Sequence, residues 1–171
     1  MHPLLFGCAA LREYHAAMSA YTVTRSAFIP APPEQIFPYV NNLHRWTEWS
    51  PWEGMDPTME KTYTGPESGP GAQYAWQGNR KVGSGRMEIV ESNEPSSVRI
   101  RLEFLKPWKA VNPTGFTFEP QAGGTRVTWS LAGQTRGLST LFVRFMNMDK
   151  MVGKDFEKGL AQLSRVAAPK E

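Results

Sequence analysis

The sequence is poor in cysteine and histidine, and this scarcity excludes several kinds of protein. Its single cysteine, Cys8, rules out an internal disulfide framework, so a reducing, cytoplasmic location is the simplest interpretation. The three histidines, His2, His15 and His44, are too scattered to give metal-ligand spacing. We therefore expect no metal and no other cofactor.

Long hydrophobic runs and clusters of one charge are also missing. The apolar stretch at residues 3–11 is far shorter than the ~20 residues that span a membrane, so we expect no stable membrane insertion. The Lys and Arg residues are interspersed with Glu and never form a run of five, which argues against nucleic acid as a partner. Neither a GxSxG nucleophile elbow nor a GxxxxGK(S/T) or GxGxxG phosphate loop is present.

What the sequence does contain is a large share of aromatic residues in a chain of single-domain length. Six Trp, nine Phe and five Tyr residues stand beside eight Met. A chain of 171 residues buries ~70% of the surface that its unfolded form exposes, so a core can form without disulfides. Large side chains of this kind fill plain cores, and they also line irregular apolar pockets.

Seven segments have the alternation or the β-branched content of strands. The first, residues 21–29, ends at Pro30. The clearest alternation is in residues 98–104, where Val98 and Ile100 point to one face and Arg99 and Arg101 to the other. The remaining strands are expected at residues 59–64, 73–77, 85–90, 116–119 and 125–131. Short strands with turn signals between most of them predict an antiparallel meander.

Helical spacing is found in two parts of the chain. Pro32 and Pro33 precede one short helix, and residues 44–52 continue as a second that Pro51 ends. In the last third, apolar residues recur every three or four positions and predict one amphipathic helix of up to roughly 40 Å. They are Leu141, Phe145, Met148, Val152, Phe156, Leu160, Leu163 and Val166.

The order of these elements predicts an α+β fold. We expect a curved antiparallel sheet of about seven strands, two short helices after the first strand, and one long C-terminal helix that closes the sheet and encloses a cavity. Residues 1–20 read as a leader or an extended start outside the fold, with Met18 as a candidate natural start. The domain is expected to cover residues 21–168.

Four stretches of the sequence resemble one superfamily. They are residues 29–37 (IPAPPEQIF), 46–52 (WTEWSPW), 123–129 (GGTRVTW) and 148–160 (MDKMVGKDFEKGL). The chain from about Tyr21 onward is similar to the SRPBCC superfamily (START, birch-pollen-allergen-like), in particular to bacterial members labelled polyketide cyclase/dehydrase. The resemblance implies the helix-grip fold, with a deep pocket between the concave face of the sheet and the terminal helix. It is weak evidence of function, because the label covers carriers, cyclases and chaperone activators.

The candidate ligand-binding residues are those expected to face this pocket. Trp46, Trp49 and Trp52 recur every three residues, which indicates either an aromatic rim that grips a flat or lipid-like ligand or a hydrophobic plug between helix and sheet. The parity of the strands and the stripe of the long helix add the other candidates, for each of which plain core filling is the alternative. They are Tyr74, Trp76, Met87, Ile89, Phe116, Phe118, Trp129, Met148, Met151 and Val152.

Polar residues that could act on a ligand are few. Asn79, Asp149 and Tyr63 are the weak catalytic candidates, since a cyclase needs a group that removes a proton next to a carbonyl and a donor that holds the enolate oxygen. A solvated helix face is the alternative for Asp149.

The main hypothesis is a binding module, a monomer or homodimer, for a small hydrophobic molecule. The alternatives are a polyketide cyclase or aromatase that needs no metal, and a chaperone-activator-like domain whose outer sheet face, with Arg99, Arg101 and Glu103, meets a partner.

Overall fold

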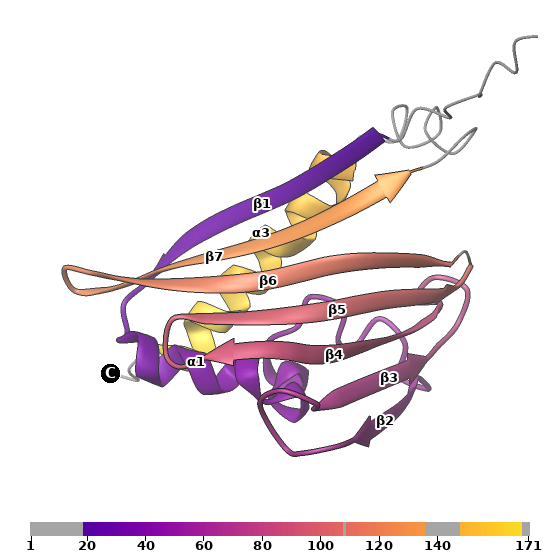
Figure 1. The fold of residues 1–171 in the computed structure, drawn as a ribbon, viewed down its shortest axis with the longest axis horizontal. Helices are drawn as coiled ribbons and strands as arrows, with labels where there is room; N and C mark the ends of the chain where they lie inside the picture. Colours follow the sequence, from indigo (N-terminus) through magenta and orange to yellow (C-terminus); the bar gives the residue numbers. More distant parts are fainter. Residues whose placement is uncertain (1–18, 108, 136–147, 169–171) are drawn as a thin grey trace, which may run out of the picture.

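The computed structural model of the protein describes residues 19–107, 109–135 and 148–168. Figure 1 shows one sheet with helices on one of its faces. The elements in chain order are β1 (Ser19–Ile29), α1 (Pro33–Asn41), the 3₁₀ helix η1 (Leu43–Glu48), β2 (Glu60–Thr64), β3 (Gln73–Gln77), β4 (Ser84–Asn93), β5 (Ser97–Lys106), β6 (Ala110–Gln121), β7 (Gly124–Thr135) and α3 (Met148–Ala167). The predicted α+β helix-grip fold is confirmed.

All seven strands form one antiparallel sheet in the order β1-β7-β6-β5-β4-β3-β2. Consecutive strands from β2 to β7 are neighbours, as a meander requires, and β1 pairs with β7 along its whole length. The alternation predicted for β5 is confirmed, since Val98 and Ile100 are buried while Arg99 and Arg101 are exposed. The edges of the sheet are β1 and β2.

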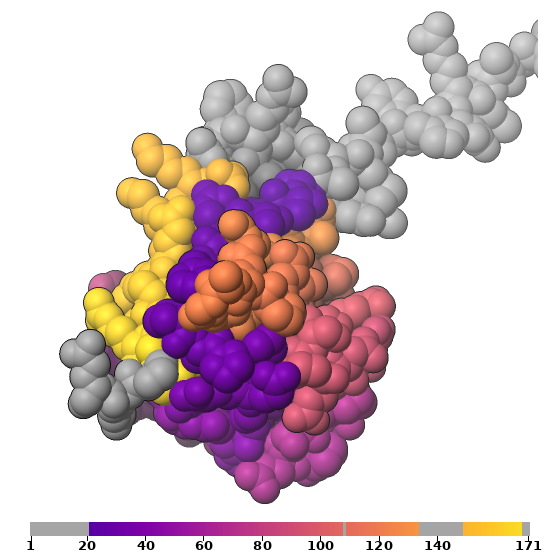
Figure 2. All heavy atoms as spheres, turned by 90° about the vertical axis from the view of Figure 1, so that its left-hand side faces the viewer, coloured from indigo at the N-terminus to yellow at the C-terminus, as the bar shows by residue number. Residues whose placement is uncertain are grey.

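The helices cover one face of the sheet, which we call the inner face. There α3 packs against β1, β7 and α1, and α1 packs against β5 and β6. Figure 1 shows α3 crossing behind the sheet toward α1, and Figure 2 shows it beside β1 from another side. Phe156, Leu160 and Leu163 are buried, which confirms the apolar stripe over this part of the helix. The predicted positions Leu141 and Phe145 lie outside the described residues.

The two glycines of α3 mark a close approach to the sheet. A Cβ atom at Gly159 would lie 2.9 Å from the ring of Trp129 and 3.1 Å from Pro51. A Cβ atom at Gly153 would overlap the guanidinium group of Arg25 on β1. At Gly159 the neighbours are the rings of Trp129 and Pro51, so packing favours glycine there, although glycine weakens a helix by about 1 kcal/mol relative to alanine. At Gly153 the neighbour is the flexible end of the Arg25 side chain, which can shift.

Most observed boundaries differ from the predicted ones by one to several residues. The second helix is shorter than residues 44–52 and is a 3₁₀ helix, Leu43–Glu48, because Pro51 disfavours a helical Ser50. The strand predicted at residues 116–119 is β6, Ala110–Gln121, and Pro113 lies just before Thr114, where pairing with β7 begins. The first strand begins at Ser19 rather than at residue 21.

Within the described residues, no helix combines the length and the apolar character needed to cross a bilayer.

Candidate functional site

Aromatic rings fill the inner face where η1 and the middle of α3 meet the sheet. The ring of Trp129 lies parallel to that of Phe156, with centroids 3.9 Å apart, and it stacks on Phe116 at 4.8 Å. Trp46 and Trp49 lie 4.7 Å apart and contact both Phe116 and Trp129 edge to face. The cavity expected under this part of the helix is therefore filled by side chains, and we call this group the aromatic core.

The indole N–H groups of the aromatic core are satisfied within the protein. Trp46 donates to the carbonyl of Val40 at 3.0 Å, and Trp49 donates to the carbonyl of Tyr39 at 2.9 Å. Trp129 donates to the hydroxyl of Thr114 at 3.0 Å. These bonds fix the rings in place, since a buried N–H without a partner costs about 1–3 kcal/mol.

Several candidate ligand-binding residues belong to this packed region. Trp46, Trp49, Ile89, Phe116, Phe118 and Trp129 are buried, which is the arrangement of a hydrophobic plug. Trp52 and Val152 are half-buried at its border, and Met151 is 48% exposed. Nothing is described of the side chain of Met148. No contact here tests ligand binding by these residues, and that role stays a prediction.

The inner face continues over β3, β4 and β5 as a second aromatic and apolar area. Strand register places Tyr74, Met87 and Leu102 in one row and Trp76, Gly85 and Phe104 in the next. Tyr74 and Met87 are buried, whereas Trp76, Leu102 and Phe104 are only half-buried. We call Tyr74, Trp76, Met87, Leu102 and Phe104 the β3–β5 floor.

Glycine at position 85 shapes this floor. A Cβ atom there would lie 2.5 Å from the ring of Trp76, so only glycine lets the indole lie against the strand. The ring of Phe104 meets Trp76 edge to face at 6.1 Å, and the ring of Tyr74 lies roughly parallel to Trp76 at 5.8 Å. The three aromatic residues of the floor are thus connected through Trp76.

Titratable groups gather at the β2 side of the floor. Lys61 forms an ion pair with Glu53 at 2.5 Å, and each side chain is about one quarter exposed. Lys61 lies opposite Trp76, and Tyr63 lies opposite Tyr74. Burial, reinforced by the charge of Glu53, raises the pKa of Tyr63, and burial raises that of Tyr74 still further. Both phenols therefore stay protonated at neutral pH and can donate hydrogen bonds.

A buried amide limits the floor on its β6 side. Asn112, which is 4% exposed and lies opposite Leu102, donates to the hydroxyl of Tyr21 at 3.1 Å and to the carbonyl of Ala132 at 3.0 Å. Both N–H groups of this amide are therefore used within the protein.

The structure does not bring the three catalytic candidates together. Asn79 is exposed in the β3–β4 turn, where its side-chain oxygen accepts from the backbone N–H groups of Lys81 and Val82. Asp149 accepts from Arg25 at 2.9 Å, and this bond lowers the pKa of Asp149. Tyr63 lies on β2, at the edge of the sheet opposite to β1. Only Tyr63 therefore adjoins the β3–β5 floor.

Sequence reasoning missed several residues of this area. Glu53, Lys61 and Asn112 stand in no motif, and the chain gives no signal that they meet the floor. The alternation of β5 did place Leu102 and Phe104 on the inner face, but only the strand register shows that they adjoin Tyr74 and Trp76.

Neither a second surface hollow nor a metal centre is a stronger candidate for the functional site. A surface hollow of about 110 Å³ adjoins His44 and Tyr63, whose rings stack at 3.9 Å, but it is small against the ~300–1,000 Å³ of typical ligand pockets. Across the part of the chain that the structure describes, no three His, Cys, Asp or Glu side chains are arranged to hold a metal ion.

Comparison with known proteins relates the chain to one family. Residues 20–168 match the sequence profile of the family described as polyketide cyclase / dehydrase and lipid transport. No curated protein matches the sequence.

Several solved structures are similar in fold. A Chromobacterium violaceum protein is 12% identical with a TM-score of 0.62, covering 87% of this chain and 98% of that chain. A Staphylococcus aureus protein of unknown function is 9% identical with a TM-score of 0.67, covering 88% and 94%. The di-domain ARO/CYC protein BexL of the BE-7585A biosynthetic pathway is 11% identical with a TM-score of 0.66, covering 89% of this chain and 51% of that one. Such low identities establish the fold alone.

Proposed function

Because the chain belongs to the polyketide cyclase / dehydrase and lipid transport family, we propose that it binds a small hydrophobic or aromatic molecule on the β3–β5 floor. One observation carries the proposal: Trp76, Leu102 and Phe104 point to the inner face and yet stay half-buried. Each Å² of exposed apolar surface that a ligand covers makes the binding free energy more favourable by about 25 cal/mol. The aromatic core has no comparable surface to offer.

The groups around the floor define the chemistry of the ligand. The rings of Tyr74, Trp76 and Phe104 suit a flat apolar body, because aromatic rings pack face to face or edge to face. The phenols of Tyr63 and Tyr74 suit a carbonyl or hydroxyl oxygen at one end of that body. We therefore infer a ligand with a planar hydrophobic part and a small polar end.

A cytoplasmic location stays a prediction.

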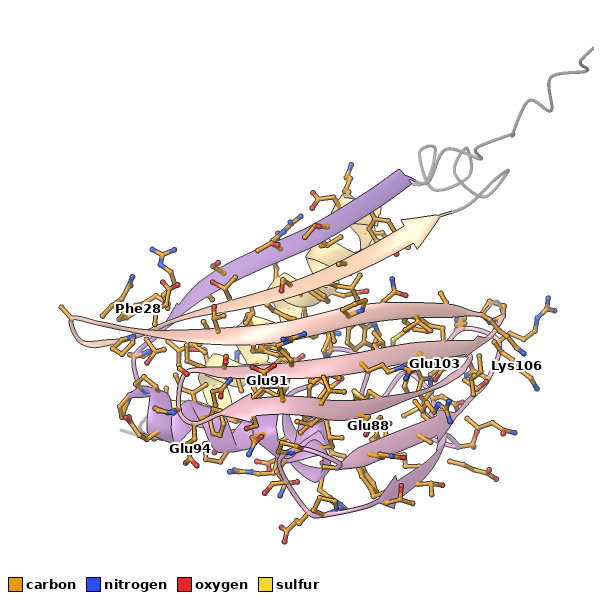
Figure 3. All side chains as sticks on the ribbon, in the orientation of Figure 1. Phe28, Glu88, Glu91, Glu94, Glu103 and Lys106 are labelled. Atoms are coloured by element: carbon orange, nitrogen blue, oxygen red, sulfur yellow. The ribbon has the colours of Figure 1, made fainter. Side chains whose placement is uncertain are left out.

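The test is a binding titration of the full chain with 2-acetonaphthone, a flat aromatic methyl ketone, in which NMR measures the bound fraction. Trp76→Ala and Phe104→Ala should each weaken the affinity about tenfold, which corresponds to one lost ring contact of about 1.4 kcal/mol. The matched control is Phe28→Ala, because Phe28 is 50% exposed on the other face of the sheet, near the β6–β7 turn (Figure 3).

Unchanged binding by both floor variants would contradict the proposal, and so would an equal loss in Phe28→Ala. Circular dichroism of each variant separates loss of the site from loss of the fold. Trp129→Ala enters the comparison as a core variant whose affinity, measured on the folded fraction, should change less than that of Trp76→Ala.

The polar groups beside the floor favour cyclase-type chemistry as a second candidate. In such a step the carboxylate of Glu53 takes a proton from the carbon next to a ligand carbonyl, and the phenol of Tyr63 donates a hydrogen bond to the enolate oxygen that forms. The charge of Glu53 acts on both phenols, which supports their proximity. Glu53 also forms an ion pair with Lys61 at the β2 side of the floor.

This second candidate has its own measurement. In D₂O the protein should speed deuterium uptake at the methyl group of 2-acetonaphthone, and Glu53→Gln should lower that rate about 10²-fold, the usual size of a general-base effect. Tyr63→Phe should lower the rate while leaving the affinity within a factor of a few. Exchange no faster than in buffer, with binding intact, would leave the protein a carrier and exclude this activity.

A further inference from the structure

The outer face of the sheet, which is turned away from α3, carries an ordered set of charges on β4 and β5. Strand register pairs Arg86 with Glu103, Glu88 with Arg101, and Glu91 with Arg99. Figure 3 labels Glu88 and Glu91 on β4 and Glu103 on β5 on the side facing the viewer. We call these six residues the charge ladder. In each of its three rows, one strand contributes the positive charge and the other the negative charge.

The middle row differs from the two that flank it. Arg86 and Glu103 are joined at 2.6 Å, and Arg99 and Glu91 at 2.7 Å. Within the described residues, no ion pair joins Glu88 to Arg101. A surface hollow of about 120 Å³ lies beside this row; it is lined by Gln73, Arg86, Met87, Glu88, Arg101 and Glu103. Arg101 is exposed, so a carboxylate from outside can reach its guanidinium group, although its charge also acts on Glu103.

This arrangement is complementary to itself. Consider a second copy whose outer face lies against this one, related by a two-fold axis that runs parallel to the strands, midway between β4 and β5. Strand β4 of one copy then lies over β5 of the other copy. Each β4 residue therefore faces, in the second copy, the same β5 residue that it pairs with in its own sheet. Glu88 then faces Arg101 of the second copy, and both other rows also match opposite charges. Isologous dimers require such a self-matching patch.

The residues beside the charge ladder fit the same arrangement. Val111 on β6 and Ala75 on β3 lie at the two ends of the row that contains Arg86 and Glu103. The same axis places Val111, which is 50% exposed, opposite Ala75 of the second copy. Sheets pack face to face at ~10 Å with strands nearly aligned, and the aliphatic stems of Arg side chains bury apolar surface in such contacts.

We propose that the charge ladder is the dimer interface of this protein, with a second copy of the same chain as its partner. Three positive and three negative charges favour neither a polyanion nor a polycation, whereas they match their own two-fold image in every row. The interface leaves the β3–β5 floor free, since that floor lies on the opposite face of the sheet.

The test measures the mass of the full chain by sedimentation equilibrium at 50 mM and 500 mM NaCl. The wild type should dimerise, with a Kd at least about tenfold weaker at high salt because exposed charges are screened. Glu88→Arg and Arg101→Glu should each weaken dimerisation about tenfold or more. Mixing the two single variants should restore dimers, because the copy with two positive side chains in the middle row then faces the copy with two negative side chains there.

Further variants make the result decisive. The double variant E88R/R101E should dimerise like the wild type, because the exchanged row again matches opposite charges. Glu119→Arg is the control with the same change of net charge, since Glu119 is exposed on β6 opposite Arg126 and outside the ladder. A wild type that stays monomeric at low salt overturns the proposal, as does a dimer that Glu88→Arg leaves intact. Failure of the mixed variants to associate overturns the two-fold geometry.

Discussion

Trp129 lies at the junction of β7, η1 and α3, and its ring contacts the rings of Trp46, Trp49, Phe116 and Phe156. Trp129→Ala should lower the free energy of unfolding by about 3–5 kcal/mol, because it leaves a cavity in a packed core. It also removes the donor to the hydroxyl of Thr114. Urea denaturation at neutral pH measures this loss.

The comparison for Trp129→Ala is again Phe28→Ala, which removes a large ring from the surface. Its effect should stay below about 1 kcal/mol, as is usual for surface sites. A loss of similar size in both variants would mean that the aromatic core is looser than its ring contacts indicate.

At the residue scale, sequence reasoning found the right face more often than the right role. Strand alternation placed Tyr74, Met87 and Trp129 on the inner face, and they are buried there. Alternation could not separate the aromatic core from the β3–β5 floor. That division depends on which strands α3 covers and on the hydrogen-bond acceptor that each indole N–H finds.

At the scale of elements, α3 shows a conflict between helix propensity and packing. Gly159→Ala gains about 1 kcal/mol of helix propensity, but its new methyl group would lie 2.9 Å from Trp129 and 3.1 Å from Pro51. Overpacking of a core costs about 1–3 kcal/mol, so we expect a net loss of about 1 kcal/mol in urea denaturation.

Lys154→Ala, at an exposed site of the same helix, is the reference for Gly159→Ala. It adds alanine without any packing conflict and should change stability by less than about 0.5 kcal/mol. A gain in stability from Gly159→Ala would show that α3 can move away from the sheet at no cost.

Strand β6 shows why the ends of some strands could not be predicted from the sequence. Pro113, Gly115 and Pro120 interrupt the apolar alternation, so only residues 116–119 look like a strand. The observed strand is longer because β5 and β7 pair with it from both sides. Tertiary pairing of this kind overrides local propensity. Strand β5, whose alternation is unbroken, was predicted to within a few residues.

At the scale of the whole molecule, the two halves of the inner face have different neighbours. Strands β1, β6 and β7 are long and are covered by α3 and α1. Strands β2 and β3 have five residues each, and β2 is an edge strand that ends the sheet. This asymmetry could not be read from the sequence, because it follows from strand order and from the path of α3.

Local stability should follow this division, and hydrogen exchange followed by mass spectrometry measures it. Amides of β6 and β7 should exchange only through global unfolding, whereas those of β2 and β3 should exchange through smaller openings and at least about tenfold faster, because short strands at an edge have few buried contacts. Saturation with 2-acetonaphthone should slow exchange in β3, which carries Tyr74 and Trp76, and leave β7 unchanged. Equal protection of all strands without ligand would mean that the sheet opens as one unit, and ligand protection confined to β7 would place the binding site at the aromatic core.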